Sequence, residues 1–360
     1  MTDLPDFLKQ GEAARLFPVL STTSKEGRAT SILLSCIEKV DEFAAELLKT
    51  LGLKPGKRTV VQSYTEVVFK DKLHDDQRPD GLIVVSTGVQ KKYYLVEAKI
   101  GSAKLNASQI ESYVRICKEK KLEGVITISN QFSSSPSVHP LEEVRKLKIK
   151  VPVFHWSWMS ILTTIDLMIS NQSIADRDQK LLINELRRFL SHDSTGVKGF
   201  DRMPPEWANI NKIIASQGNL SPRSKDALSV VDGWKQETKD LCLILSRLTN
   251  TKVIEKLPAR YIKNPENRRK AGVKTLVENQ RLVANFEIIG AAAPLEVVAD
   301  IKQRSIYVGM TLNAPQDKKS STARLNWLTR QIKKCDLSDC YIRANWPGSS
   351  PSTSHLATDL

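Results

Sequence analysis

Apolar residues in the first half of the chain recur with two different periods. Over residues 29–51 they return at every third or fourth position, as on one face of a helix, and Gly52 predicts the helix end. A similar period predicts a helix at 106–121, and apolar residues also predict a helix at 156–168. Short runs rich in β-branched and aromatic residues predict strands at 60–69, 80–86, 93–99, 124–129 and 151–155.

This order of elements predicts an α/β domain with a mixed sheet flanked by helices, over residues 1–170. Residues 171–346 differ, because helical patterns come first and strand patterns follow. Helices are expected at 176–190, 206–216, 222–248 and 323–334, and strands at 252–257, 273–278, 282–289, 295–301, 305–312 and 340–344. The second region is therefore predicted to be an α+β domain. The Ser-, Pro- and Thr-rich residues 347–360 are expected to be a disordered tail.

Length and composition narrow the class of protein. The 360 residues suggest two domains, and 41% hydrophobic residues are typical of a globular protein. No apolar run approaches the roughly 20 residues of a membrane-spanning helix, and the N-terminus lacks the pattern of a secretory signal. The 5 cysteines form no Cys-x-x-Cys pair. We therefore expect a cytoplasmic protein without a disulfide framework or a membrane partner.

The charge is unevenly distributed along the chain. The formal net charge is +14, of which residues 1–170 carry +4 and residues 171–360 carry +10. Such a surplus favours a polyanionic partner, although a basic surface that serves only solubility is the alternative. The candidate phosphate-binding side chains form two clusters, with Arg268, Arg269 and Lys270 in one and Arg330, Lys333 and Lys334 in the other.

Two carboxylates and one lysine are predicted to converge in the first domain. Glu97 and Lys99 are two positions apart in a strand, so their side chains point to the same face. Asp80 begins the preceding strand, where a hairpin brings it beside Glu97. Two carboxylates together with a substrate phosphate and waters suit Mg²⁺, which Mn²⁺ can replace. The alternative is structural: Asp80 caps a turn, and Glu97 and Lys99 form an ordinary pair on an edge strand.

The acidic-x-Lys triplet alone is not specific, since it occurs six times in the chain. Only the triplet at Glu97 follows an apolar strand, has an acidic residue in the strand before it and precedes a helix. On that helix Gln109 and Tyr113 are four positions apart and so share a face.

With these motifs, residues 29–160 resemble the PD-(D/E)xK nuclease superfamily, and the Gln-x-x-x-Tyr helix resembles its exonuclease-type branch. The resemblance implies a restriction-endonuclease-like fold in which Asp80 and Glu97 bind the metal and Lys99 is the catalytic lysine. It also implies that Gln109 and Tyr113 assist the substrate phosphate or hold the site. A glutamate of the first helix often joins such a site; Glu38, Glu42 and Glu46 are candidates, with Glu42 favoured, and the strand residue Glu66 is a further candidate ligand.

The expected function is hydrolysis of phosphodiester bonds by a metal-dependent nuclease. DNA is the expected substrate, in restriction, anti-phage defence or repair, and a homodimer is expected by analogy with enzymes of this fold. Two alternatives stay open. One is a catalytically inactive nucleic-acid-binding or adaptor protein that retains the fold, and the other is an enzyme that cleaves RNA.

Overall fold

The computed structural model describes residues 4–18, 24–70, 77–334, 336–338, 340–344 and 353–356. It divides into two compact units. The first comprises Met1–Ala291 with Leu295–Val308, and the second comprises Ala292–Pro294 with Gly309–Leu360. This division does not coincide with the domain boundary expected near residue 170. The two predicted domains stay a prediction.

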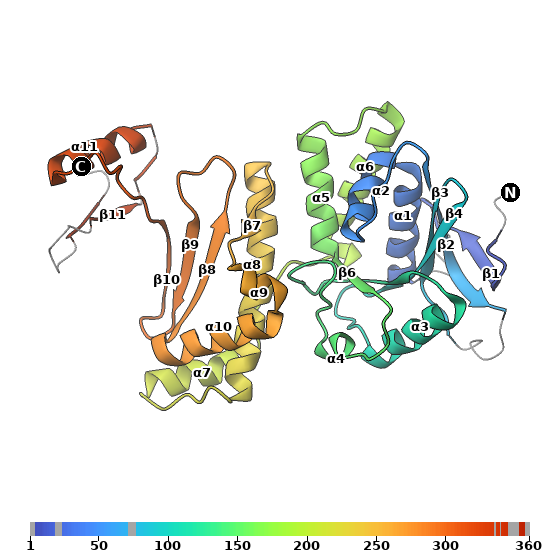
Figure 1. Cartoon of the computed structure of the whole chain (residues 1–360), viewed down its shortest axis with the longest axis horizontal. Coiled ribbons are helices and arrows are strands. Elements are labelled where there is room, and N and C mark those ends of the chain that lie inside the picture. Colours follow the sequence, from blue (N-terminus) through green and yellow to red (C-terminus); the bar gives the residue numbers. More distant parts are fainter. Residues whose placement is uncertain are drawn as a thin grey trace. The chain divides into compact units, whose positions relative to one another are not determined.

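A mixed sheet of six strands organises the first part of the chain, as the sequence predicts (Figure 1). Its strands lie in chain order, and the first four are antiparallel to their neighbours, whereas β4, β5 and β6 run parallel. The strands are β1 (Leu8–Ala13), β2 (Thr59–Phe69), β3 (Gly81–Thr87), β4 (Gln90–Ala98), β5 (Gly124–Ser129) and β6 (Val153–Ser157). The sequence did not predict β1, because Leu8 is its only buried side chain and the strand carries little apolar signal.

Helices cover both faces of this sheet (Figure 1). Successive strand residues face opposite sides, so Ile83 and Val85 join one core while Leu82 and Val84 join the other. The first core is shared with α1 (Lys25–Lys39), α2 (Asp41–Thr50), α5 (Trp158–Ser170) and α6 (Arg177–Leu190). The second core is shared with α3 (Ala107–Lys120) and α4 (Glu142–Arg145).

The helix expected over residues 29–51 is two helices. The backbone leaves the helical conformation at Val40, with φ −118° and ψ 99°, and α2 begins directly after it. The first helix also begins earlier than expected, at Lys25, because the Ser24 hydroxyl accepts a hydrogen bond from the Gly27 amide and caps the helix.

The rest of the first unit contains a helical layer against a second sheet (Figure 1). Its four strands have the order β10-β9-β8-β7, and their bounds are β7 (Ile254–Glu255), β8 (Arg281–Glu287), β9 (Leu295–Asp300) and β10 (Ser305–Met310). The helical elements are η2 (Asp193–Thr195), α7 (Glu206–Ala215), α8 (Lys225–Thr249), α9 (Ala259–Lys263) and α10 (Pro265–Asn279).

The strand expected at 273–278 is wrong, since these residues lie in α10. The segment contains the β-branched residues Val273, Thr275 and Val277, which favour a strand, but its two buried residues, Val273 and Leu276, are three apart. The decisive signal lies upstream. The Asn264 side chain accepts hydrogen bonds from the Glu266 and Asn267 amides, and Pro265 occupies the first turn, so the helix begins well before the apolar residues.

The second unit contains α11 (Ser321–Ile332) and an antiparallel pair formed by β11 (Tyr341–Ala344) and β12 (Thr353–Leu356). Residues 353–356 of the expected tail form β12, and its other residues lie outside the described part. Within the described residues, no helix combines the length and the apolar character needed to span a membrane.

Candidate active site

The pairing of β3 with β4 brings Asp80 next to Glu97. Gly81 pairs with Val96, so the residue before β3 faces the end of β4. The Ala98 amide donates a hydrogen bond of 2.8 Å to Asp80 Oδ2, which fixes this carboxylate at the strand end. A Cβ atom on Gly81 would lie 2.6 Å from Leu34 Cδ1 and 2.9 Å from the Tyr64 carbonyl oxygen. The close approach of α1 and β2 to this point therefore requires glycine.

The ammonium group of Lys99 lies among three carboxylates. Its Nζ is 2.7 Å from Glu97 Oε1, 2.9 Å from Glu26 Oε1 and 4.0 Å from Asp80 Oδ2. The backbone of Lys99 is held as well, because its carbonyl oxygen accepts a hydrogen bond of 2.9 Å from the Trp158 indole. Asp80, Glu97 and Lys99 thus meet as the sequence motif predicts, and Glu26 joins them.

Glu26 is the member of the cluster that the sequence analysis missed. It lies in the first turn of α1, whereas the apolar pattern begins only at residue 29 and placed the helix start there. The available signal was local: Ser24 is a favoured cap residue, and acidic residues are enriched in the first helical turn.

Gln109 and Tyr113 lie beside the cluster, on the helix that follows β4. The Gln109 amide donates a hydrogen bond of 2.9 Å to the Tyr113 hydroxyl. Burial raises the pKa of Tyr113, and the nearby charge of Glu97 raises it further, so the phenol stays protonated. Tyr113 therefore lies near the buried Glu97 carboxylate, and Gln109 contacts the Tyr113 hydroxyl from the same helical face.

Burial dominates the electrostatics of the cluster. It raises the pKa of Asp80 to about 7, and the charge of Glu97 adds to this effect. Burial also raises the pKa of Glu97, against the opposing hydrogen bond from Lys99. The pKa of Lys99 lies above its ordinary value despite burial, because Glu97 and Glu26 stabilise the ammonium. Three carboxylates around one ammonium leave a surplus of acidic groups, which favours a further cation.

The donor atoms fit a hard divalent ion. Carboxylate oxygens are the ligands that Mg²⁺ prefers, and Mg²⁺ commonly uses one or two of them with substrate phosphates and waters. Glu97 Oε2 is buried and has no hydrogen-bond partner, so it is an available ligand atom. In the described ranges no group of three or more His, Cys, Asp and Glu side chains forms a ready metal cage. Within the cluster, Asp80 and Glu97 are carboxylates that could hold such an ion.

The other acidic candidates have different places in the fold. Glu42 Oε1 accepts a hydrogen bond of 3.3 Å from the Ala175 amide, and Glu38 Oε2 accepts one of 2.9 Å from the Ser63 amide. Glu46 pairs with Lys49. Glu66 is exposed on β2 with a φ of 51°, and no described contact joins it to the cluster. The structure thus brings Glu26, and neither Glu42 nor Glu66, to Lys99.

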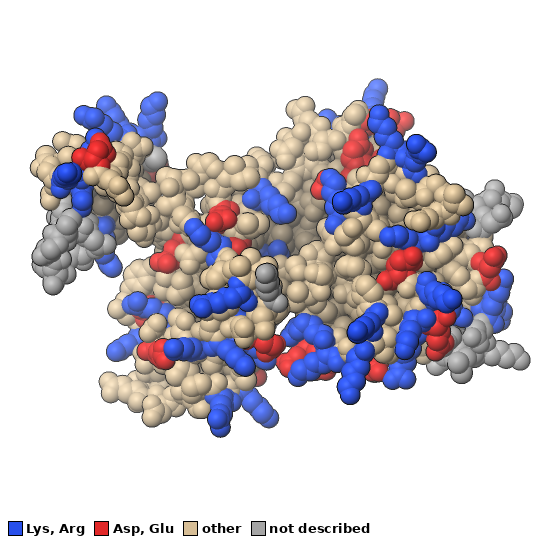
Figure 2. All heavy atoms as spheres, viewed as in Figure 1, with Lys and Arg blue, Asp and Glu red and all other residues tan. Residues whose placement is uncertain are grey.

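The basic candidates fall into two groups. Arg268 and Arg269 lie on α10 and are largely buried: Arg268 pairs with Glu255 at 2.5 Å, and Arg269 pairs with Asp232 at 2.5 Å and Glu142 at 3.3 Å. Lys270 is exposed, as are Arg330, Lys333 and Lys334 in the second unit. Figure 2 shows Lys and Arg side chains spread over the visible face among acidic ones. Arg268 and Arg269 therefore neutralise acidic side chains of the same chain.

Comparisons of the chain with protein-family models, with curated proteins and with solved structures find no match.

Proposed function

We propose that this protein is a metal-dependent nuclease of the PD-(D/E)xK type that hydrolyses phosphodiester bonds in DNA. The observation that carries the proposal is the position of Lys99 Nζ, within hydrogen-bond distance of Glu97 and Glu26 and 4.0 Å from Asp80. Phosphodiester hydrolysis needs groups that bind a cation, orient water and neutralise the charged transition state, and this cluster offers all three.

Each residue has a distinct role in this proposal. Asp80 and Glu97 bind the cation, which when present lowers the pKa of water and offsets phosphate charge. Lys99 is the one positively charged side chain of the cluster and orients the attacking water or neutralises the scissile phosphate. Glu26 holds the Lys99 ammonium in place through its 2.9 Å contact. Tyr113 and Gln109 support Glu97 and reach towards the substrate phosphate.

The surroundings of the site support the finer parts of the proposal. A mixed sheet with helices on both faces, and a Gln-x-x-x-Tyr helix after the strand that ends next to Lys99, fit a restriction-endonuclease-like fold. The basic surplus of residues 171–360 fits a nucleic-acid substrate. We extend the proposal to a cytoplasmic enzyme of restriction, anti-phage defence or repair that acts as a homodimer.

Cleavage assays test the proposal directly. Purified protein is incubated with plasmid, linear and single-stranded DNA and with RNA, in Mg²⁺ or in EDTA. We expect cleavage of DNA in Mg²⁺ alone, and a loss of about 100-fold or more in Lys99→Ala and Asp80→Ala, since a positioned catalytic group typically contributes that much. Glu42→Gln is the matched control, because it removes a carboxylate that lies outside the cluster.

Three results would contradict or correct the proposed function. Cleavage that survives both Lys99→Ala and Asp80→Ala contradicts the site assignment. Binding of DNA without cleavage of any substrate contradicts the enzyme and indicates the adaptor instead, and Mg²⁺-dependent cleavage of RNA alone corrects the substrate.

A further inference from the structure

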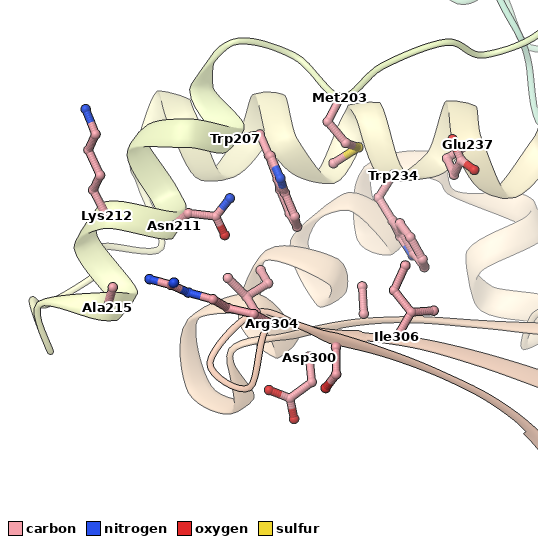
Figure 3. A pocket seen from close by; sticks show the side chains of 13 residues that line it. Met203, Trp207, Asn211, Lys212, Ala215, Trp234, Glu237, Asp300, Arg304 and Ile306 are labelled. Atoms are coloured by element: carbon pink, nitrogen blue, oxygen red, sulfur yellow. The ribbon is translucent and has the colours of Figure 1, made fainter.

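A second candidate binding site lies between the helices and the sheet of residues 203–306, all within the first unit. It is a pocket of about 650 Å³, lined by residues of α7 and α8 and of the turn between β9 and β10 (Figure 3). Small-molecule sites in proteins typically measure about 300–1,000 Å³. The size of the pocket therefore suits a ligand rather than a single water or ion.

Two tryptophans provide the apolar walls of this pocket. Trp207 extends from α7 and Trp234 from α8, and both side chains point towards the β9–β10 turn, with Met203 close by (Figure 3). The Trp234 indole donates a hydrogen bond of 3.3 Å to the Val283 carbonyl, which holds that ring in place. Among the described residues, the Trp207 indole N–H has no hydrogen-bond partner. Two half-buried indole rings favour a planar aromatic ligand that stacks on them.

Polar groups at the ends of the pocket further restrict the chemical class of ligand that it can bind. Asn211 and Arg304 lie at one end, whereas the Lys212 side chain extends away from the pocket (Figure 3). Arg304 has no ion-pair partner among the described residues. Glu237 lies at the other end, and burial raises its pKa. The Ser305 hydroxyl also lines the pocket and is buried without a hydrogen-bond partner. The acidic residue Asp300 is already bound, through Arg281 at 2.7 Å and the Gln303 amide at 2.8 Å.

We propose that this pocket binds a nucleotide, with its base against Trp207 and Trp234 and its phosphate at Arg304 and Asn211. Glu237 then accepts a hydrogen bond from an amino or ring N–H group of the base. A cationic ligand fits less well at this end, because Arg304 repels it. A purely apolar ligand offers no partner to Glu237 at one end of the pocket or to Arg304 at the other.

A base with its phosphate could reach this pocket in two forms, as a free nucleotide or as a nucleotide extruded from a nucleic acid. The pocket does not include any residue of the acidic cluster around Lys99, so this proposal stands independently of the nuclease activity.

Binding measurements on the full chain in EDTA test the proposal without any cleavage. Calorimetry is carried out with AMP, CMP, GMP and TMP, with inorganic phosphate, and with matched duplex DNA and the same duplex carrying a central mismatch. In Trp207→Leu, an apolar side chain stays against the helices while the stacking surface is lost, and we expect binding to weaken about tenfold or more. Arg304→Gln changes an exposed side chain and should weaken nucleotides several-fold without affecting folding.

Arg223→Gln is the matched control, because it removes one exposed positive charge of the same unit outside the pocket. Binding of mononucleotides that both pocket variants weaken and the control retains supports a free nucleotide as the ligand. Preference for the mismatched duplex that Trp207→Leu abolishes supports an extruded base.

The proposal is overturned if neither mononucleotides nor mismatched DNA bind. It is also overturned if Trp207→Leu and Arg304→Gln bind as wild type does, or if phosphate alone binds as well as the nucleotides. Because EDTA is present throughout, none of these outcomes depends on whether the acidic cluster cleaves DNA.

Discussion

Asp80 differs from an ordinary aspartate because it keeps its proton almost to neutral pH. Burial and the neighbouring Glu97 disfavour its charge and raise its pKa to about 7, although the Ala98 amide and Lys99 act in the opposite direction. The buried Glu97 and the half-buried Asp80 therefore lie so close together that ionisation of one carboxyl group raises the pKa of the other. A cation bound there would lower both pKa values and release the proton.

The stability of the metal-free protein should therefore depend on pH. Below about pH 4 Asp80 is protonated in both the folded and the unfolded chain, and its contribution is fully present. As pH rises towards 7, only the unfolded chain releases the proton, so the free energy of unfolding falls, by at most about 1.4 kcal/mol per pH unit for one group. Urea unfolding in EDTA at several pH values measures this slope.

Asp80→Asn should flatten the slope, since asparagine still accepts the hydrogen bond from Ala98 but does not titrate. Glu42→Gln is the control and should keep the wild-type slope. An unchanged slope in Asp80→Asn contradicts the shifted pKa.

At the scale of elements, the sequence predicted those parts of the site that depend only on the side-chain period within a strand or a helix. Glu97 and Lys99 share a strand, a short hairpin places Asp80, and helical spacing pairs Gln109 with Tyr113, so the period of each element was enough. Glu26 is different, because its approach to Lys99 depends on the packing of α1 against the sheet, across 73 residues of chain. The strand prediction at 273–278 was wrong because the helix that starts after Asn264, upstream of these residues, outweighs the strand preference of their β-branched side chains.

The cap of α1 should therefore matter to the site as well as to stability. Ser24→Ala removes the hydrogen bond to the Gly27 amide and should cost about 1 kcal/mol of unfolding free energy, measured by urea unfolding. Because Glu26 lies in the turn that this cap orders, cleavage should fall too.

Ser224→Ala is the matched control, since Ser224 caps α8 through the Ala227 amide. It should cost a similar free energy and leave cleavage unchanged. If Ser24→Ala and Ser224→Ala cleave equally well, the position of Glu26 does not contribute to cleavage.

At the scale of the whole molecule, the net charge of +14 is not equally available to a partner. Arg268 and Arg269 are engaged with acidic side chains inside the first unit. Arg330, Lys333 and Lys334 are exposed in the second unit and are better placed to meet phosphates. Counting residues in the sequence showed the excess of positive charge. It could not distinguish the paired arginines from the exposed basic side chains, because an ion pair depends on neighbours that are distant in the sequence.

Salt titrations of DNA binding in EDTA should separate the two groups. Neutralising Arg330, Lys333 and Lys334 to glutamine should lower the slope of log affinity against log salt by up to about 3, one for each lost phosphate contact. Arg268→Met should leave the slope unchanged but lower the free energy of unfolding by about 3 kcal/mol, because Glu255 is left without its partner in a largely buried position. A slope that falls only in Arg268→Met contradicts this assignment.

Gly81 sets a limit on how this protein can evolve. Any side chain at this position would meet Leu34 of α1 and the Tyr64 carbonyl of β2, and so would force these elements to shift from β3 unless the Leu34 side chain moves aside. A shift of α1 would also carry Glu26 away from Lys99, although neither residue is altered. In a lineage that retains the acidic cluster, drift is therefore expected to spare Gly81 while it changes Glu42 or Glu66. A position without a side chain would then be inherited as strictly as the charged residues that surround it.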